Sequence, residues 1–384
     1  MIRRGEAFIV GIGATEFSTC SQRSELQLTL EATRAALADA NLSVDAIDAL
    51  VTYQNDSSDP LRLAYALGLD EVRFFAQTSY GGGGACATLQ QAALAVQSGS
   101  AEAVVVYRGL NGRSKTRYGQ PTTDSPAAYF PYSAPQGLLV PGHRFALAVH
   151  RYMHEYGLRN EDFAPISVAA RGYAATNPSA CFYQRPITIE DHQSSAWVAE
   201  PVLRVLDCCL ETDGAVACIV TGGELARSLA DRPVRILASS CGLVGEPEIA
   251  SDFYRPVIGR LPESAIVAKN LWKQSGLSPD EIDVAILYDH FSPYVILQLE
   301  AFSFCKPGEG AHFVADGQIS REGSLPVNPN GGQLGEGYVH GLNGVCEAVR
   351  QIRGGAANQI PDVEHVLVTG GPGLPSSGVI LSAD

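Results

Sequence analysis

The sequence lacks several features that would place it in a common functional class. Its 384 residues carry 27 Lys and Arg against 41 Asp and Glu, which gives a formal net charge of −14. This shortage of cations argues against nucleic acid as a partner, because phosphate backbones are bound by clustered Lys and Arg. An anionic small molecule stays open, since a local basic rim or a helix N-terminus can hold a phosphate. No apolar run reaches about 18 residues, so no membrane span is predicted.

Motifs for metal and dinucleotide binding are also missing. The nine cysteines are scattered without a CxxC motif. The adjacent Cys208 and Cys209 are too cramped for an ordinary disulfide, so we expect reduced cysteines and no metal site. Gly11 and Gly13 begin a GxG pattern, but the rest of GxGxxG and the acidic residue of a second strand are absent. These gaps argue against NAD.

The first residues, MIRRGEAFIVGIGATEF, slightly resemble a signal peptide. Glu6 interrupts their apolar stretch, however, and no cleavage-like segment follows. We interpret the stretch as the first β-strand of a cytoplasmic protein. The composition, 46% hydrophobic and 18% charged, is that of a packed globular chain.

The sequence contains an internal repeat. Residues 42–56 read LSVDAIDALVTYQND and residues 277–291 read LSPDEIDVAILYDHF. Each begins at a turn-forming Ser and enters an apolar run typical of a buried strand, which ends at Tyr53 in one copy and at Tyr288 in the other. The repeat therefore predicts two related halves.

Further matched pairs extend the repeat along both copies. They are the helical segments Gly82 to Gly99 and Gly337 to Gly354, the strands 101–107 and 363–369, and the closing strands 214–220 and 378–381. Strands that alternate with helices predict βαβ units with parallel sheets. We therefore expect two stacked α/β halves about a pseudo-twofold axis.

We place these halves at residues 1–230 and 231–384, with an insertion at about 111–200 in the first. The insertion begins rich in Pro, Tyr and Ser and becomes helical at FALAVHRYMHEYG (145–157). Ligands bind beyond the carboxyl ends of parallel strands, where insertions collect. The insertion is therefore predicted to be a loop domain over the site.

Two glycine-rich segments are candidate parts of that site. Tyr80 precedes four glycines at a strand-to-helix turn, where Gly81, Gly82 and Gly83 fit an oxyanion-type nest at a helix N-terminus. A tight helix contact across a dimer explains the same glycines, and both interpretations stay open. The second segment, NPNGGQLGEGY (328–338), is predicted to be a catalytic loop in which Asn330 and Gly337 bind substrate; an ordinary surface turn is the alternative.

Several motifs resemble the thiolase superfamily, and specifically its lipid-transfer (sterol-carrier) branch. They are VGIGATEF (10–17), RYMHEYG (151–157), NP (177–178), PIT (186–188), LDCCLETDGAVA (206–217), YDHF (288–291), PVNPNGGQLGEGY (326–338) and AVRQIRGG (348–355). The resemblance covers nearly the whole chain. It implies the thiolase fold: two α/β halves with mixed five-stranded sheets, stacked as αβαβα, plus a loop domain.

The catalytic motifs depart from this family. The position of the nucleophilic cysteine aligns at about Gly82, and Cys86 lies one helical turn further on, so we interpret Cys86 as packing. Where the family has histidines in its HDCF-type and Gly-His-Pro motifs, this chain has Tyr288 and Tyr338. Without the nucleophile, acyl-enzyme chemistry is removed, whereas two tyrosines at acid/base positions preserve proton transfer.

This pattern resembles the steroid side-chain-cleaving aldolases of bacterial sterol degradation. The resemblance implies a lyase that splits a β-hydroxy acyl-CoA into a 17-ketosteroid and propionyl-CoA by retro-aldol cleavage. Coenzyme A is then part of the substrate, and no other cofactor and no metal is expected. The resemblance also implies a small OB-fold, acyl-CoA-associated partner and a homodimeric core within a heterotetramer.

For the acid/base work we expect Tyr288 and Tyr338, with His290 or His340 as proton relays. A free tyrosine has a pKa of about 10, which burial would raise and a helix N-terminus would lower. Tyr338 enters a helix through glycines and so has the second influence available. The alternative for His290 is a hydrogen-bonded structural residue, and Tyr294 is expected to pack against the loop domain.

Two rival functions fit part of the pattern. One is a thiolase such as acetyl-CoA acetyltransferase with an unconventional nucleophile. The other is a non-catalytic acyl-CoA or lipid-binding protein. Both histidines are replaced by the same titratable residue, whereas drift would leave a mixture, and this favours the aldolase.

Overall fold

A computed structural model describes residues 5–54, 58–78, 81–115, 117–121, 130–229, 232–244, 257–371 and 376–384. Arg3, Arg4, Tyr80 and residues 122–129, which include part of the Pro-rich start of the insertion, lie outside this range. The expectations for those residues therefore stay predictions.

The first half contains a mixed sheet of five strands. They are β1 (Ala7–Ala14), β2 (Ala49–Tyr53), β3 (Phe74–Thr78), β4 (Ala103–Asn111) and β7 (Asp213–Gly222). Their order is β3-β2-β4-β7-β1, in which β2 pairs in parallel with β3 and β4 while β7 is antiparallel to both its neighbours.

The second half repeats this order. Its strands are β8 (Val234–Gly242), β9 (Val284–Ile286), β10 (His365–Thr369) and β11 (Ser376–Ala383). They follow β1 as β8-β11-β10-β9, again with only the closing strand antiparallel to its neighbours. A short antiparallel contact of Phe8 with Arg235 and Ile9 with Val234 joins the halves into one nine-stranded sheet. The internal repeat predicted from the sequence is thereby confirmed.

The second half differs from the first in having four strands, where five were expected. At the place of the missing edge strand, Val327 forms only a single parallel bridge to Ala285. Pro326 and Pro329 flank this bridge, and a proline has no backbone N–H to extend a ladder. The chain is thus released into the glycine-rich loop 328–338. Strand β9 likewise ends at Ile286, two residues before Tyr288.

Helices form three layers around these strands. The outer layers are α1 (Glu25–Asp39) and α2 (Pro60–Leu67) on the first half, and α9 (Pro262–Ser275) and α10 (Pro293–Ala301) on the second. Between the halves lie α3 (Ala85–Gln97) and α13 (Leu342–Arg353), which contact strands of both. One apolar core surrounds α3 and α13 and reaches strands of both halves, and two further cores lie under the outer helices, which confirms the αβαβα arrangement.

The GxG of β1 is explained by helix packing. A β-carbon at Gly11 or Gly13 would lie 2.2 Å from the backbone oxygen of Ala36 or Ala32 in α1. Only glycine lets the helix approach the strand this closely. These glycines therefore serve the packing of α1 on β1.

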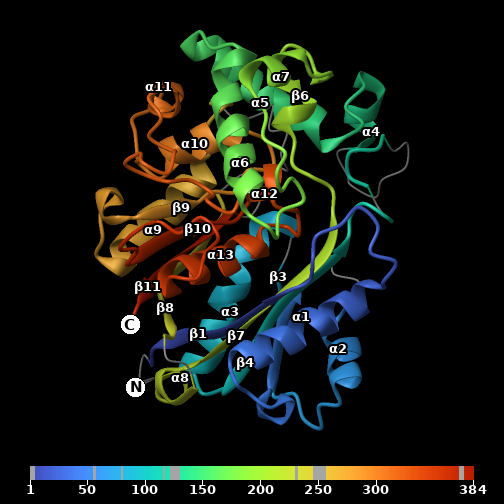
Figure 1. Ribbon diagram of the computed structural model, residues 1–384, viewed down its shortest axis with the longest axis vertical. Helices are drawn as coiled ribbons and strands as arrows, with labels where there is room; N and C mark the ends of the chain where they lie inside the picture. Colours follow the sequence, from blue (N-terminus) through green and yellow to red (C-terminus); the bar gives the residue numbers. More distant parts are fainter. Residues whose placement is uncertain are drawn as a thin grey trace.

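The insertion between β4 and β7 forms the end of the molecule opposite α1 and α2 (Figure 1). It contains α4 (Phe130–Ser133), α5 (Pro141–Tyr156), α6 (Ala164–Thr176), α7 (Ile189–Ser194), and the hairpin of β5 (Trp197–Ala199) and β6 (Leu203–Arg204). The remaining helices are α8 (Gly223–Leu229), α11 (Gly310–Ala315) and α12 (Gly332–Gly335).

Buried Asp207 ties this insertion to the second half. Its carboxylate accepts hydrogen bonds from His192 Nε2 (2.8 Å), Asn160 Nδ2 (2.8 Å) and the Arg204 backbone N–H (2.8 Å), and from the Ser292 hydroxyl at the start of α10. Asp207, His192 and Ser292 are completely buried. The residues just before Ser292 include Tyr288, so this network fixes one wall of the candidate site.

Candidate active site

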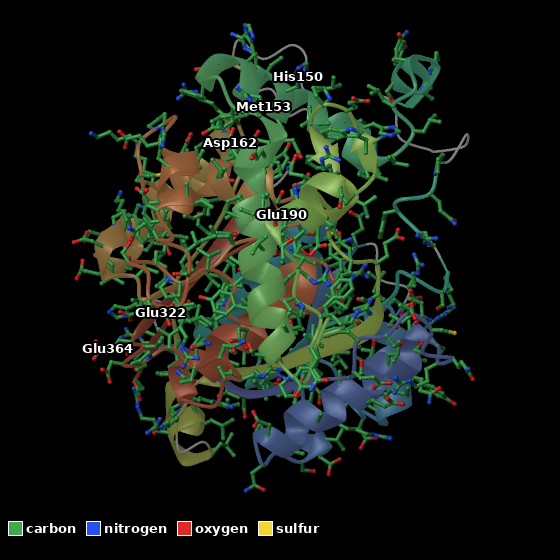
Figure 2. All side chains as sticks on the ribbon, turned by 45° about the horizontal axis from the view of Figure 1, so that its top comes forward. His150, Met153, Asp162, Glu190, Glu322 and Glu364 are labelled. Atoms are coloured by element: carbon green, nitrogen blue, oxygen red, sulfur yellow. The ribbon has the colours of Figure 1, made fainter. Side chains whose placement is uncertain are left out.

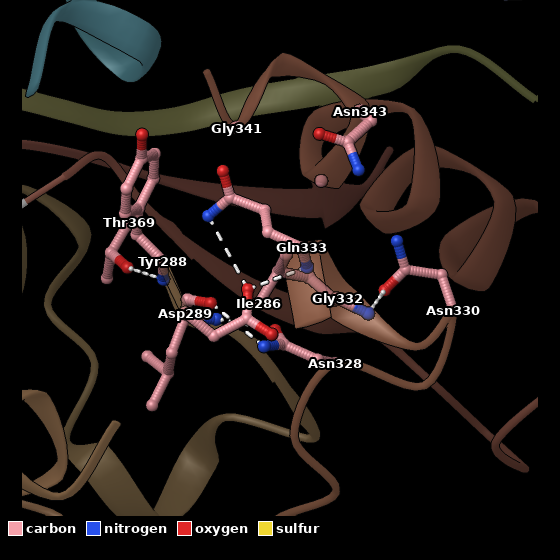
Figure 3. Close-up of a pocket in the computed structure, with 12 residues that line it drawn as sticks. Ile286, Tyr288, Asp289, Asn328, Asn330, Gly332, Gln333, Gly341, Asn343 and Thr369 are labelled. Atoms are coloured by element: carbon pink, nitrogen blue, oxygen red, sulfur yellow. Dashed lines mark hydrogen bonds between the residues drawn. The ribbon is translucent and has the colours of Figure 1, made fainter. Parts of the chain in front are cut away.

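The two predicted tyrosines meet. Their hydroxyl oxygens lie 3.2 Å apart, within hydrogen-bond distance. The backbone N–H of Tyr288 donates to Thr369 Oγ1 (2.9 Å), and its carbonyl accepts from Gln298 Nε2 (2.8 Å). Figure 3 shows the Tyr288 ring extending away from Asp289, which turns toward Gln333. Tyr288 is thus held at its backbone while its hydroxyl reaches the second tyrosine.

Tyr338 is held on the opposite loop by Thr212. The Thr212 hydroxyl accepts from the Tyr338 N–H (2.8 Å) and donates to the Tyr338 carbonyl (3.1 Å). Thr212 immediately precedes β7, so a strand of the first half fixes the glycine-rich loop 328–338 of the second. Sequence patterns gave no sign of this contact.

Loss of solvent raises the pKa of both tyrosines. Burial raises the pKa of Tyr288 far above its usual value, and the hydrogen bond from Tyr338 opposes this rise. Burial, and then the nearby Tyr288, raise the pKa of Tyr338 well above its usual value. A helix N-terminus was expected to lower the pKa of Tyr338. It does not outweigh burial here, because α13 begins only at Leu342. Both hydroxyls therefore carry their protons near neutral pH.

The glycine turn lies directly against Tyr288. A β-carbon at Gly82 would be 1.9 Å from the Tyr288 hydroxyl oxygen and 2.3 Å from its Cζ. The turn forms a 3-10 segment, Gly81–Gly84, which leads straight into α3. Its carbonyls are fixed because Gly82 accepts from the Gly371 N–H (2.8 Å) and Gly83 from the Ser377 hydroxyl (2.6 Å). Gly82 thus borders Tyr288, whereas the adjacent Gly81 lies against His340. The oxyanion role expected of Gly81, Gly82 and Gly83 stays a prediction.

Cys86 is part of the core. Its Sγ donates to the Val368 carbonyl (3.4 Å), and burial raises the pKa of this thiol far above its usual value. A buried, protonated thiol in this position is no nucleophile. The geometry supports its interpretation as a packing residue.

Asn330 and Gly337 support the glycine-rich loop 328–338 from within. Asn330 Nδ2 donates to Glu336 Oε2 (2.6 Å), and Asn330 Oδ1 accepts from the Gly332 N–H (3.2 Å). A β-carbon at Gly337 would lie 2.5 Å from Cγ of Phe17. Among the described residues neither one hydrogen-bonds to the tyrosine pair. Their expected contact with substrate stays a prediction.

His290 lies in an aromatic cage. Its ring centroid is 4.6 Å from that of Phe145, 4.7 Å from those of Phe291 and Tyr294, and 5.2 Å from that of Tyr288. Neither ring nitrogen has a hydrogen-bond partner within the described part of the chain, and burial lowers the pKa of His290 to about 3. The imidazole is therefore neutral, and the hydrogen bond that a relay to Tyr288 requires is not formed.

Tyr294 packs against the insertion, as expected. Its hydroxyl donates to the carbonyl of Phe145 in α5 (3.3 Å), and the two rings meet edge to face at 5.2 Å. Its pKa is raised by burial alone.

Sequence reasoning missed Arg108. This arginine of β4 is completely buried, and its Nη2 lies 2.9 Å from Nδ1 of His340, two residues beyond Tyr338. A lone arginine within the apolar run AVVVYRGL is the pattern that could have found it. No group of three or more His, Cys, Asp or Glu side chains suited to a metal ion occurs among the described residues.

Comparisons with known proteins agree with this geometry. A family model for thiolase C-terminal domain-like sequences matches residues 261–382. The 17-hydroxy-3-oxo-4-pregnene-20-carboxyl-CoA lyase of Mycobacterium tuberculosis is 51% identical over 98% of this chain and 99% of its own length. The chain belongs to the thiolase superfamily.

Other relatives show which branch of the thiolase superfamily this protein resembles. The steroid side-chain-cleaving aldolase of Thermomonospora curvata is 50% identical over 99% of this chain and 98% of its own length. A solved structure titled Ltp2-ChsH2(DUF35) aldolase is 49% identical, with a TM-score of 0.95 over 100% of this chain and 99% of that one. The predicted fold, lipid-transfer branch and enzyme class, a carbon–carbon lyase, are confirmed. Among the described residues, no helix is long and apolar enough to cross a membrane.

Proposed function

We propose that this protein catalyses retro-aldol cleavage of a β-hydroxy acyl-CoA steroid side chain to a 17-ketosteroid and propionyl-CoA. The observation that carries the proposal is the position of the Tyr288 hydroxyl. It fills the space that a side chain at residue 82 would need and lies 3.2 Å from the Tyr338 hydroxyl. In this proposal the tyrosine pair transfers protons and adjoins the position that aligns with the family's nucleophile. The names of the relatives support the same reaction.

The chemistry requires one proton to move within the substrate. The β-hydroxyl loses its proton and becomes the steroid ketone as the bond between the α- and β-carbons breaks. The electron pair of that bond enters the thioester as an enolate, and the α-carbon then takes up a proton. Since the thioester is the electron sink, neither a metal nor a Schiff base is required, and coenzyme A is part of the substrate.

The tyrosine pair offers a route for this proton. One hydroxyl takes the proton of the β-hydroxyl while its own proton passes to the other tyrosine, whose proton goes to the α-carbon. The pair ends with the same number of protons and needs no resting phenolate. This suits two tyrosines whose pKa values are raised by burial. Which tyrosine faces the β-hydroxyl stays open.

The enolate oxygen requires hydrogen-bond donors. Backbone N–H groups at the start of a helix have no acceptor within the helix. The turn Gly81–Gly84 leads into α3 and borders Tyr288, so its N–H groups are our candidates for stabilising the developing charge.

We also propose a small OB-fold partner, because the related solved structure is titled as a complex with a DUF35 protein. The surface suits a partner with a basic face, since exposed Asp162 and Glu190 lie on the insertion and exposed Glu322 and Glu364 on the second half (Figure 2).

A homodimeric core is proposed at the free edge of β3. Phe75 on this edge strand is 68% exposed, and Leu61 and Tyr65 on the neighbouring α2 are 80% and 87% exposed. Apolar side chains beside an unpaired strand edge favour pairing with a second copy. A heterotetramer of two copies of each chain combines both interfaces.

The experiment is co-expression with a small OB-fold protein of the DUF35 type, followed by incubation with 17-hydroxy-3-oxo-4-pregnene-20-carboxyl-CoA and mass spectrometry of the products. Tyr288→Phe and Tyr338→Phe are each expected to lower kcat on the order of 10²- to 10⁴-fold. Saturable binding without cleavage would support the lipid-binding alternative. An acyl-enzyme, or transfer of acetyl groups between coenzyme A molecules, would support the acetyltransferase.

A further inference from the structure

Arg108 is a buried cation with an unusual neighbour. It belongs to β4, where its side chain is 0% exposed, and its Cζ lies 5.0 Å from the ring centroid of Tyr53. Its Nη2 approaches His340 Nδ1 to 2.9 Å. A buried charge is costly unless it is paired and hydrogen-bonded. The function proposed above gives this arginine no role.

The contact with Arg108 determines which ring nitrogen of His340 carries the proton. A guanidinium has only donors, so Nδ1 of His340 must accept and cannot carry a proton. The ring proton therefore lies on Nε2. A second proton would place an imidazolium against the guanidinium, and burial together with Arg108 lowers the pKa of His340 well below its usual value. His340 is thus a neutral imidazole with one N–H, at Nε2.

The backbone of His340 is held in place as well. Its φ is +53°, in the left-handed region that is uncommon for a residue with a side chain. The hydroxyl of Tyr53 donates to the His340 carbonyl (3.3 Å). Arg108 and Tyr53, which pack on each other, therefore fix both the ring and the main chain of this residue.

The Nε2 edge faces the active-site turn. A β-carbon at Gly81 would lie 3.4 Å from His340 Nε2, and one at the adjacent Gly82 would lie 1.9 Å from the Tyr288 hydroxyl. The ring centroid of His340 is 5.1 Å from that of Tyr338. In the described part of the chain, Nε2 has no hydrogen-bond partner. The His340 donor and the Tyr288 hydroxyl therefore lie against two adjacent glycines of the same turn.

We propose that His340 is a fixed, neutral hydrogen-bond donor whose Nε2–H binds the thioester oxygen as it takes on enolate charge. Arg108 is the positioning residue that holds this tautomer. The inference rests on the proposed retro-aldol reaction and deepens it. No proton passes through the ring, because Nδ1 is occupied by the guanidinium. His340 therefore differs from the relay that its spacing from Tyr338 suggests.

The first experiment determines the tautomer of His340, a measurement that does not depend on catalytic activity. The full-length complex with its OB-fold partner is labelled with ¹⁵N-histidine, and His340 is assigned by comparison with His340→Gln. We expect Nδ1 to resonate as a bare nitrogen and Nε2 as a protonated one, unchanged from about pH 6 to 8, around the ordinary histidine pKa. In Arg108→Met we expect the two tautomers to mix, and in Arg108→Lys, which restores a group with donors only, the bare Nδ1 to return.

Kinetics then test the donor. His340→Phe is expected to lower kcat on the order of 10²- to 10³-fold with KM changed only a few-fold, as for removal of an oxyanion donor. His340→Gln keeps a neutral N–H near the position of Nε2 and should recover most of this loss. His150→Gln on the exposed face of α5 is the matched control and should behave as the wild type. Circular dichroism checks that each variant is folded.

The outcomes separate the two proposals. A proton on Nδ1 in the wild type, or a His340→Phe variant that keeps its kcat, overturns the inference. A rise in KM alone also overturns it, because it assigns His340 to substrate binding. A wild-type complex that cleaves no β-hydroxy acyl-CoA overturns the proposed function instead, while the spectrum still reports the tautomer.

Discussion

The hydroxyl oxygen of Tyr288 lies 1.9 Å from the point where a β-carbon of residue 82 would stand. The two positions therefore exclude each other: a side chain at residue 82 and a tyrosine at residue 288 cannot coexist in this backbone. The glycine at residue 82 is thus a steric requirement of a tyrosine at residue 288.

This coupling predicts the behaviour of Gly82 variants. Gly82→Ala should lower kcat by more than about 100-fold, because Tyr288 must shift away from Tyr338 and a displacement of about 1 Å costs this much. Gly172→Ala in α6, where an added β-carbon meets nothing within 4 Å, is the control and should leave kcat unchanged. Wild-type kcat in Gly82→Ala would show that Tyr288 has no fixed role.

The same relationship predicts a non-additive double variant. Gly82→Cys alone should destabilise the fold, whereas Gly82→Cys combined with Tyr288→His should recover much of that loss, because histidine lacks the phenol oxygen that clashes. Thermal unfolding of the two single variants and the double variant measures the coupling. Strictly additive changes in the free energy of unfolding would contradict the steric argument.

The raised pKa values of the tyrosines predict a flat pH profile. If a phenolate were the base, kcat would rise about tenfold per pH unit below its pKa. Because burial keeps both hydroxyls protonated, the relay between them should leave kcat constant within about two-fold from pH 7.5 to 9. Steady-state turnover at saturating substrate decides between a phenolate base and a relay between protonated hydroxyls. Circular dichroism at each pH checks the fold.

The sequence predicted the proximity of Tyr288, Tyr338 and Gly82 better than the pKa values of the two tyrosines. The repeat placed Tyr288 after a strand and Tyr338 before a helix, and the motif order aligned Gly82 with the missing nucleophile, so proximity of the three followed from topology. The pKa direction did not follow, because it depends on how completely the insertion and the two loops remove solvent. The Arg108–His340 contact joins residues 232 positions apart and leaves no local pattern beyond one cation in an apolar strand.

The fold, too, could be predicted from the sequence only in part. Strand and helix order could be predicted from the repeat, since each copy has matching apolar runs. The edge strand of the second half could not, because its loss depends on two prolines on either side of Val327 within a segment that otherwise aligns with the family. The place of Asn330 in the loop favours a contact with substrate, whereas its buried amide donates to Glu336.

His290 gives a prediction about catalysis that separates a relay from a packing residue. Its two ring nitrogens are buried without partners in the described structure, inside a cage of aromatic rings. His290→Phe should therefore keep kcat within about three-fold and leave stability unchanged or raised by about 1 kcal/mol, since a desolvated polar group is removed. If kcat instead falls by about 100-fold or more, the typical effect of losing a general acid or base, the relay role predicted from the sequence is restored.

The lowered pKa of His290 also predicts how the stability of the fold decreases at acid pH. Its pKa is lowered to about 3 in the folded chain, against about 6.5 in an unfolded one. As pH falls below about 6.5 the unfolded chain binds a proton that the folded chain does not, so stability is lost progressively until about pH 3. In this window His290→Phe should lose stability less steeply than the wild type, by up to about 1.4 kcal/mol per pH unit. Urea unfolding of both proteins at pH 7, 6 and 5 measures the difference; parallel curves would mean that the imidazole is protonated in its cage.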